Sequence, residues 1–300
     1  MGLLKENKFK NPQDRAIWNT PENAFDWSWP KVPRHQFLSE KEKAYDFNGD
    51  SLLIPLDISN VLKTSYMATT PSILARYIKI NSKKNLSHIL STSGEIYYVL
   101  EGKGFSKNEN EMIEWSKGDV FCFPGGKETE HSSIADNSIL FLVTNEPLLN
   151  FEQLSPSNNN SNILPSHWSH EKTASFLEER YKRPKTKETS GVAVLFSTEE
   201  TLPSRNTIPS INTSINTLEA GGDQRPHRHN GVAITLAIEG EKVYSMIEDQ
   251  KIDWKNGVAQ ITPAAELHSH HNRGSKRMIS FVVQDEGLHW YLRTTGFSWD

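Results

Sequence analysis

Short apolar runs separated by turn residues fill the chain between residues 52 and 149. They are rich in isoleucine, valine, tyrosine and phenylalanine, the residue types that half-buried β-strands favour. Several short strands at this spacing are typical of a β-sandwich or a β-barrel, so we predict a barrel over residues 51–150. The clearest runs are Ile73–Ile80, Glu95–Leu100, Val120–Phe123 and Ile139–Val143.

The same pattern returns after residue 190. It predicts a second all-β barrel over residues 191–300, again because the runs are short and rich in β-branched residues. The strands expected there are Ala193–Phe196, Ile211–Leu218, Val232–Ile238, Lys242–Ile247, Val258–Ile261 and Met278–Gln284.

The two halves also correspond to each other in order and spacing. This separation is much longer than the period of a solenoid, so the correspondence indicates a duplicated barrel. Three pairs of segments match: Glu95–Gly102 (EIYYVLEG) with Ala233–Gly240 (AITLAIEG), Gly118–Pro124 with Gly257–Pro263, and Ile139–Val143 with Ile279–Val283.

Residues 1–50 are rich in tryptophan, proline and asparagine. The prolines exclude a regular helix or a central strand around Trp18, Trp27 and Trp29. We interpret these residues as an irregular N-terminal arm that lays aromatic side chains on a barrel or on a neighbouring subunit. A surface wrap without function is the alternative.

Residues 151–190 are expected to link the two barrels. Ser155–Ser161 is nearly all serine, asparagine and proline, which is typical of a loop. Glu171–Tyr181 has helical spacing, and Ser169 is a candidate N-cap. The expected apolar side of this short helix consists of Ala174, Phe176, Leu177 and Tyr181.

Composition and charge narrow the possible partners. The 300 residues suffice for two domains, and with a net charge of −4 and no basic stripe we expect no nucleic-acid partner. The chain has no apolar run of membrane-spanning length, and Met1–Lys10 lacks the apolar core of a signal peptide. The single cysteine, Cys122, cannot form an internal disulfide and lies between phenylalanines, as a buried strand residue would. We therefore expect a cytoplasmic protein without a membrane partner.

Histidines are concentrated in the second half, where candidate chemistry begins. His227 and His229 alternate on an expected strand, so both side chains point to one face, which in a small barrel is the interior. His268 follows Pro263, which can start a turn back to the same rim. Three neutral imidazoles that converge in this way would bind iron, manganese, cobalt, nickel, copper or zinc.

The spacing around these histidines resembles the two sequence motifs of the cupin superfamily. The resemblance implies tandem double-stranded β-helix (jelly-roll) barrels with a metal inside. It also implies a ligand set of three histidines, because the place of the usual glutamate ligand holds Ala233, while Ala265 replaces a usual glycine. The motif positions are Gly221, His227, His229 and Gly240, then Gly257, Pro263, His268 and Asn272.

Within the cupins, HRHNGVAITLAIEG and ITPAAELHSHHN are similar to the gentisate 1,2-dioxygenase group of bicupins, most specifically over residues 210–290. This resemblance implies an Fe(II) site, or one for Mn, Ni or Zn, with open positions for a hydroxylated aromatic carboxylate and O2. It also implies ring cleavage with both oxygen atoms, and a homo-oligomer, either a dimer or a tetramer. Thr235 stands where those enzymes usually have an arginine that holds the substrate carboxylate.

Other side chains near the motifs are candidates for catalysis or substrate binding. His270 faces the same way as His268 if the segment is extended, so it could transfer protons or simply lie solvated at the rim. Gln284 and Asp285 end a strand and could hydrogen-bond a ligand histidine or the substrate. Candidates for bidentate carboxylate capture, each of which could also be an ordinary surface residue, are Arg205, Arg225 and Arg293.

The first barrel has a degenerate version of the site. His88, Glu95 and His131 lie near ligand places, but Leu90 takes the place of the second histidine, and His131 is displaced by two residues from the usual spacing after Pro124. A second metal is possible there, and we interpret the first barrel as a structural barrel without one.

Three functions fit these features. The first is a non-haem Fe(II) dioxygenase that cleaves a hydroxylated aromatic carboxylate of the gentisate or salicylate kind, or acts on a related small acid. The second is a lyase, isomerase or hydrolase that uses Zn, Mn or Ni as a Lewis acid. The third is a bicupin that binds a small molecule without turnover.

Overall fold

The computed structural model describes residues 11–23, 30–134, 136–157, 161–184, 186 and 191–300. It divides into two units, Met1–Pro30 and Lys31–Asp300. In the first unit, the short helix α1 (Pro12–Arg15) is capped by the side chain of Asn11, and Trp18 is 81% exposed. Trp27 and Trp29 lie outside the described residues, so the proposed aromatic arm stays a prediction.

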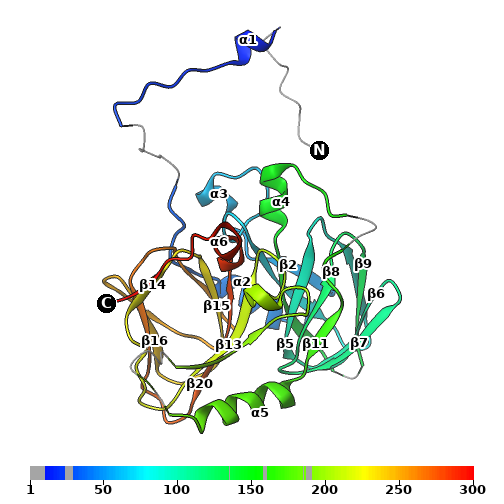
Figure 1. Ribbon diagram of the computed structural model, residues 1–300. Helices are drawn as coiled ribbons and strands as arrows, with labels where there is room; N and C mark the ends of the chain where they lie inside the picture. The colour runs from blue at the N-terminus through cyan, green and yellow to red at the C-terminus, as the bar shows by residue number, and fades with distance from the viewer. Residues whose placement is uncertain (1–10, 24–29, 135, 158–160, 185, 187–190) are drawn as a thin grey trace. The chain divides into compact units, whose positions relative to one another are not determined.

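The second unit holds two β-barrels side by side (Figure 1). In the N-terminal barrel, one sheet runs in the order β11-β8-β5-β10-β3-β2 and the other in the order β4-β9-β6-β7. Their strands are β2 (Leu52–Pro55), β3 (Leu74–Ile80), β4 (Asn85–Ile89), β5 (Gly94–Glu101), β6 (Lys103–Asn108), β7 (Glu111–Ser116), β8 (Val120–Pro124), β9 (Glu128–Ser133), β10 (Ser138–Thr144) and β11 (Ser166–Trp168).

The C-terminal barrel repeats this arrangement, with sheets β1-β18-β15-β20-β13-β12 and β17-β16-β19-β14-β21. Strands β8-β5-β10-β3 correspond to β18-β15-β20-β13, and the predicted duplication is confirmed. The strands are β1 (His35–Gln36), β12 (Val192–Phe196), β13 (Asn212–Leu218), β14 (His227–His229), β15 (Ala233–Glu239), β16 (Val243–Ile247), β17 (Gln250–Asp253), β18 (Ala259–Thr262), β19 (His268–Asn272), β20 (Met278–Gln284) and β21 (Phe297–Trp299).

The larger sheets of the two barrels pack against each other. Alternate residues of β5 face opposite sides: Tyr97 joins the core inside the N-terminal barrel, and Tyr98 joins the core between the barrels. Tyr98 stacks on Phe281 of the other barrel, with ring centroids 5.1 Å apart. Both faces of the larger sheet of the N-terminal barrel are therefore buried, which explains why its strands β5, β8 and β10 are largely apolar.

The segment before the first barrel departs from the expected irregular arm. β1 pairs with β18 of the C-terminal barrel, and the helix α2 (Leu38–Tyr45) follows it. The helix escaped prediction because it buries only Ala44 and has no apolar stripe. The boundaries predicted near residues 50, 150 and 190 stay predictions.

The linker helix α5 (His170–Tyr181) begins at Ser169, whose side chain accepts from the backbone N–H of Lys172, and this N-cap prediction is confirmed. Its buried residues are Thr173 and Leu177. The expectation that Phe176 belongs to the apolar side is wrong, since Phe176 is exposed. The other helices are α3 (Ser59–Leu62), α4 (Glu146–Glu152), α6 (Glu286–Leu292) and the 3-10 turn η1 (Leu202–Ser204).

The two barrels differ in what fills them. The N-terminal interior is packed with large apolar side chains such as Phe121, Phe123 and Trp115. In the C-terminal barrel, Leu236 and Phe281 face the core between the barrels, so the residues next to them along each strand face the interior. Two of these interior residues, Thr235 and Ser280, are polar. The second barrel therefore has a polar interior in which ligands can bind.

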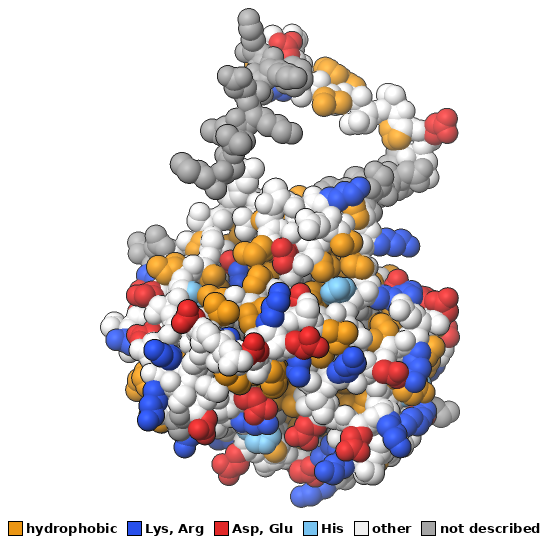
Figure 2. All heavy atoms as spheres, turned by 180° about the vertical axis from the view of Figure 1, so that it is seen from behind, with side chains coloured by type: hydrophobic (Ala, Val, Ile, Leu, Met, Phe, Trp, Pro, Cys, Tyr) orange, Lys and Arg blue, Asp and Glu red, His pale blue; other side chains and the backbone are white. Residues whose placement is uncertain are grey.

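Acidic and basic side chains are interspersed on the face of the molecule seen in Figure 2. Among the described residues, no helix has both the length and the apolar character that crossing a membrane requires.

Candidate metal centre

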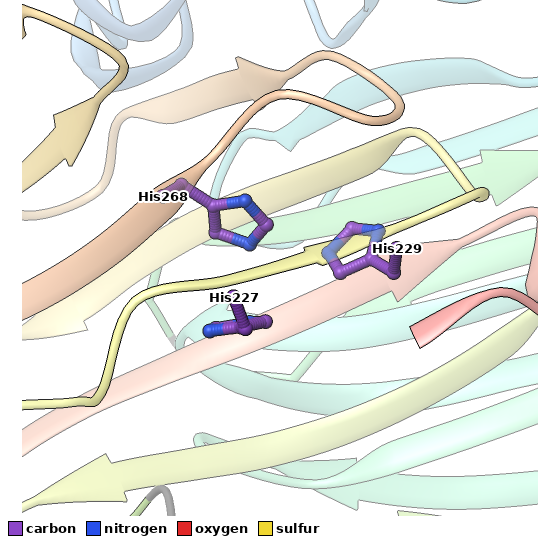
Figure 3. Close-up of side chains that lie close together, drawn as sticks. All are labelled: His227, His229 and His268. Atoms are coloured by element: carbon purple, nitrogen blue, oxygen red, sulfur yellow. The ribbon is translucent and has the colours of Figure 1, made fainter. Parts of the chain in front are cut away.

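Strands β14 and β19 bring three histidines together inside the C-terminal barrel. His227 lies directly opposite His268 in the antiparallel pair, and His229 follows on the same face of β14. One nitrogen of each ring lies within 4.8 Å of the others, and all three side chains are buried (Figure 3). Of the residues that the structure describes, these form the one such group of potential metal ligands.

The hydrogen bonds of the three rings fix which nitrogen faces the centre. The Nδ1 atoms of His227, His229 and His268 lie 3.0, 2.7 and 2.8 Å from the backbone carbonyl oxygens of residues 225, 231 and 266. A carbonyl oxygen can only accept, so each Nδ1 carries the hydrogen and donates it. Each Nε2 therefore presents a lone pair, as a metal ligand must.

Burial keeps these imidazoles neutral. Burial and the neighbouring histidines lower the pKa of His268 to about 2, and burial lowers the pKa of His229 to about 4. Burial also lowers the pKa of His227. Neutral imidazoles with an unprotonated Nε2 are the donors that Fe, Mn, Ni and Zn ions take, so these residues fit a divalent transition metal.

A neutral amide lies near the place of the missing carboxylate. Ala233 occupies the usual glutamate position, and Gln284 lies directly opposite it on β20. The Gln284 side-chain nitrogen is 3.2 Å from His229 Nε2, so Gln284 reaches the histidine cluster. Asp285 points elsewhere, because its carboxylate accepts from Ser72 Oγ of the other barrel at 2.5 Å and from the backbone N–H of Val232 at 2.8 Å.

The cupin domain family matches residues 214–284, which contain the three histidines. The salicylate 1,2-dioxygenase of Pseudaminobacter salicylatoxidans has the same two-barrel fold, with a TM-score of 0.76 and 13% sequence identity over 96% of this chain and 94% of that one. The chain has the bicupin fold of two tandem cupin barrels.

Two curated relatives are similar to parts of this bicupin. One is the 5-aminosalicylate 1,2-dioxygenase of Comamonas sp, 28% identical over 81 residues, and the other is the gentisate 1,2-dioxygenase of Ralstonia sp, 24% identical over 132 residues. The matches cover 27% and 44% of this chain, but only 22% and 37% of the two relatives. Because the chain covers well under two thirds of these relatives, the matches alone do not assign the relatives' activities to this chain.

His270 differs from the three clustered histidines in its tautomer. Ser245 Oγ accepts hydrogen bonds from Trp254 Nε1 at 2.7 Å and Gln260 Nε2 at 3.1 Å, and it lies 2.9 Å from His270 Nδ1. With both lone pairs occupied, the Ser245 hydroxyl must donate to Nδ1, so the hydrogen of His270 is on Nε2.

The orientation of Gln260 supports this assignment, because its Oε1 accepts from Gln36 Nε2 on β1 at 3.1 Å. Burial lowers the pKa of His270 to about 3, so the ring is neutral. Its ring centroid lies 5.9 Å from that of His268. His270 is thus a hydrogen-bond donor beside the centre and not a fourth ligand through Nε2.

The N-terminal barrel contains the same Trp–Ser–His arrangement, but of the ligand histidines it keeps only His88, the counterpart of His227. Trp115 Nε1 donates to Ser106 Oγ at 2.8 Å, and Ser106 Oγ lies 2.6 Å from His131 Nδ1. His131 is therefore the counterpart of His270. Thr129, which lies opposite His88, is the counterpart of His268. This explains the two-residue displacement of His131 that the sequence showed.

Hydrogen bonds inside the first barrel engage one oxygen of the buried carboxylate of Glu95, whereas its other oxygen, Oε1, has no hydrogen-bond partner. Glu95 accepts from the Tyr97 hydroxyl at 2.6 Å and from Thr129 Oγ1 at 2.7 Å, and it lies 3.5 Å from His88 Nε2. The interpretation of this barrel as structural and without a metal stays a prediction.

The candidate substrate residues lie in different parts of the C-terminal half, and not all of them are near the three histidines. Thr235 is buried on β15, on the face opposite the inter-barrel core. Arg205 ends the turn η1, and Arg293 donates to the backbone carbonyls of α6, so the described hydrogen bonds of neither side chain reach the histidines. The guanidinium of Arg225 lies over the ring of Trp299, which in turn lies next to the ring of His227.

Sequence reasoning missed β21, which is the edge strand beside β14. It places the rings of Phe297 and Trp299 5.4 and 5.6 Å from the ring of His227. A signal was present, since two aromatic residues separated by one serine have the period of a strand.

Proposed function

We propose that this bicupin is a non-haem Fe(II) dioxygenase that cleaves the ring of a hydroxylated aromatic carboxylate, with the metal held by His227, His229 and His268. The observation that carries the proposal is the set of three neutral imidazoles whose Nε2 atoms converge without a carboxylate. The names of the relatives support the substrate class, as do solved complexes of the salicylate 1,2-dioxygenase with gentisate.

In this proposal, the bound metal supplies a positive charge that lowers the pKa of a substrate hydroxyl and a place where O2 can meet the ring. Neutral ligands leave most of that charge uncompensated. His270 donates its Nε2 hydrogen to an oxygen of the substrate. Gln284 orients the substrate through its amide, because it lies directly opposite Ala233, the residue at the position where other cupins have a glutamate ligand.

The surrounding barrel contributes rigidity. The backbone carbonyls that accept from the three Nδ1 atoms hold the rings in place before a metal arrives, which lowers the entropic cost of binding. Asp285 acts indirectly: it holds the backbone of Val232, directly after the glycine whose carbonyl orients His229. The cytoplasmic location and the homo-oligomeric state stay predictions.

An oxygen-uptake experiment tests the function. Protein purified without oxygen and loaded with Fe(II) should consume one O2 for each molecule of salicylate, gentisate or 5-aminosalicylate that disappears. Zinc-loaded protein should be inactive, since ring cleavage needs a redox-active metal. Turnover that persists with zinc and without oxygen would instead establish a Lewis-acid enzyme, and absence of uptake across the panel would contradict the proposal.

A further inference from the structure

Strand β21 forms part of the inner wall next to the metal centre. In its pairing with β14, Trp299 lies directly opposite His227, and Phe297 lies directly opposite His229. Residues directly opposite each other in an antiparallel pair share one face of the sheet. The two aromatic side chains therefore face the barrel interior, in line with the two ligand histidines.

The intervening pair of residues lies on the outer face. Ser298 is opposite Arg228, whose guanidinium lies 3.9 Å from the carboxylate of Glu248 on the surface. Ser298 thus belongs to the same strand as the aromatic residues but points away from the metal centre. It offers a matched control for any substitution on β21.

The inner face is open to solvent at this edge. Phe297 is 54% exposed although it faces the interior, whereas His227 and His229 are each only 7% exposed. An apolar ring that is half exposed beside a buried polar cluster marks the mouth of the barrel. Phe297 packs edge-on against Trp299, with ring centroids 4.8 Å apart.

Backbone hydrogen bonds on both sides hold this aromatic wall in place. The backbone N–H of Asn230 donates to the carbonyl of Gly296 at 3.0 Å, and that of Asp300 donates to the carbonyl of Pro226 at 3.1 Å. The wall is therefore preorganised and does not have to form when a ligand arrives.

A cation completes the mouth. The guanidinium of Arg225 lies 5.2 Å from the ring centre of Trp299, and its Nε and Nη2 donate to the Asp300 carbonyl. The Nη1 group supplies two more N–H donors, so the side chain can also bind a carboxylate. An aromatic surface with a cation packed against it matches an aromatic ring that carries a carboxylate.

We propose that Phe297 and Trp299 are the wall against which the substrate ring packs, and that Arg225 faces the substrate carboxylate. This inference rests on the proposed function, because it assumes a substrate that reaches the three histidines. It makes β21 the element that selects aromatic over aliphatic hydroxy acids.

The test compares two hydroxy acids, salicylate with a ring and lactate without one. Binding to Fe(II)-loaded protein is measured calorimetrically without oxygen, so that no turnover is needed. Replacing Phe297 or Trp299 with alanine should weaken salicylate binding by about tenfold and leave lactate binding within about twofold. Ser298→Ala should change neither, and Arg225→Gln should weaken both.

Metal content, measured by elemental analysis for every variant, distinguishes a loss of substrate binding from damage to the metal site. Phe297→Leu keeps most of the apolar volume and should retain full metal content while losing part of the preference for salicylate. The proposal is overturned if the alanine variants lose metal, if they weaken both acids equally, or if wild-type protein binds salicylate no better than lactate. Failure of the proposed function looks different: the preference for salicylate persists, but no oxygen is consumed.

Discussion

Single hydrogen atoms distinguish the roles of the histidines in this bicupin. Three rings donate from Nδ1 to backbone carbonyls and aim a lone pair at one point. His270 accepts at Nδ1 from Ser245 and keeps its hydrogen on Nε2. The neighbours of each ring, and not the residue type, therefore determine whether a histidine can bind a metal or donate to a ligand.

Removing one ligand should abolish metal binding. His268→Ala is expected to lower the iron content of anaerobically purified protein by about tenfold or more, because two imidazoles hold a divalent ion weakly. His271→Ala is the control, since this neighbour stacks on Tyr244 and pairs with Asp223 instead. Elemental analysis measures both, and equal metal content in the two variants would contradict the assignment.

Removing the serine that orients His270 should impair turnover but not metal binding. Ser245→Ala frees the ring to adopt either tautomer, so the proposed oxygenase rate should fall by about tenfold or more while the iron content stays constant. Ser106→Ala removes the matching serine from the N-terminal barrel, and each variant should lose about 1–3 kcal/mol of unfolding free energy. If Ser245→Ala retained full activity, His270 would have no such role in turnover.

At the scale of elements, strand β11 and the start of helix α5 connect the linker to the first barrel. Strand β11 pairs with β8, and Asp119 accepts from His167 Nε2 at 3.1 Å and from the backbone N–H of His170 at 2.7 Å. Burial raises the pKa of Asp119, but the hydrogen bonds from His167, His170 and Ser116 outweigh it and leave that pKa below its usual value. One carboxylate thus joins β8, β11 and the start of α5.

This carboxylate should make stability depend on pH. The folded pKa of Asp119 lies below the unfolded value of 3.8. Its contribution to the free energy of unfolding is therefore complete above pH 3.8 and disappears as the pH falls through the folded pKa. Asp119→Asn should therefore cost about 1–3 kcal/mol at pH 7 and clearly less at pH 3. Urea unfolding at both pH values measures this, with the exposed Asp50→Asn as control; a cost that grows at low pH would refute it.

At the scale of the whole second unit, the two barrels share one core. Tyr98, Phe141 and Phe281 meet between the large sheets, and Phe281 is fully buried. Asp285 and Ser72 add a hydrogen bond across the same junction. The first barrel, filled with apolar side chains, thus supports the second, whose polar interior cannot supply as much hydrophobic stabilisation.

Weakening this shared core should destabilise both barrels together. Phe281→Ala is expected to cost about 3–5 kcal/mol, because it leaves a cavity between two sheets that cannot collapse. Phe176→Ala on the exposed side of α5 should change the unfolding free energy by no more than about 0.5 kcal/mol. Urea denaturation followed by circular dichroism tests this, and two separated transitions in wild-type protein would show that the barrels unfold independently.

The sequence alone determined the central strands of the two larger sheets, the duplication and the face on which His227 and His229 point. These features are local, because alternation along one strand fixes which side chains share a face. The correspondence of Glu95–Gly102 with Ala233–Gly240 was visible for the same reason.

Only the tertiary structure decided which strands pair and in what register. The register sets Thr129 opposite His88 and His268 opposite His227, and so makes His131 the counterpart of His270. Pairing likewise brings β21 to the metal centre and β1 to the second barrel. Such contacts join residues far apart in the chain, and a strand's own pattern does not specify its partner, so no single-strand argument could have found them.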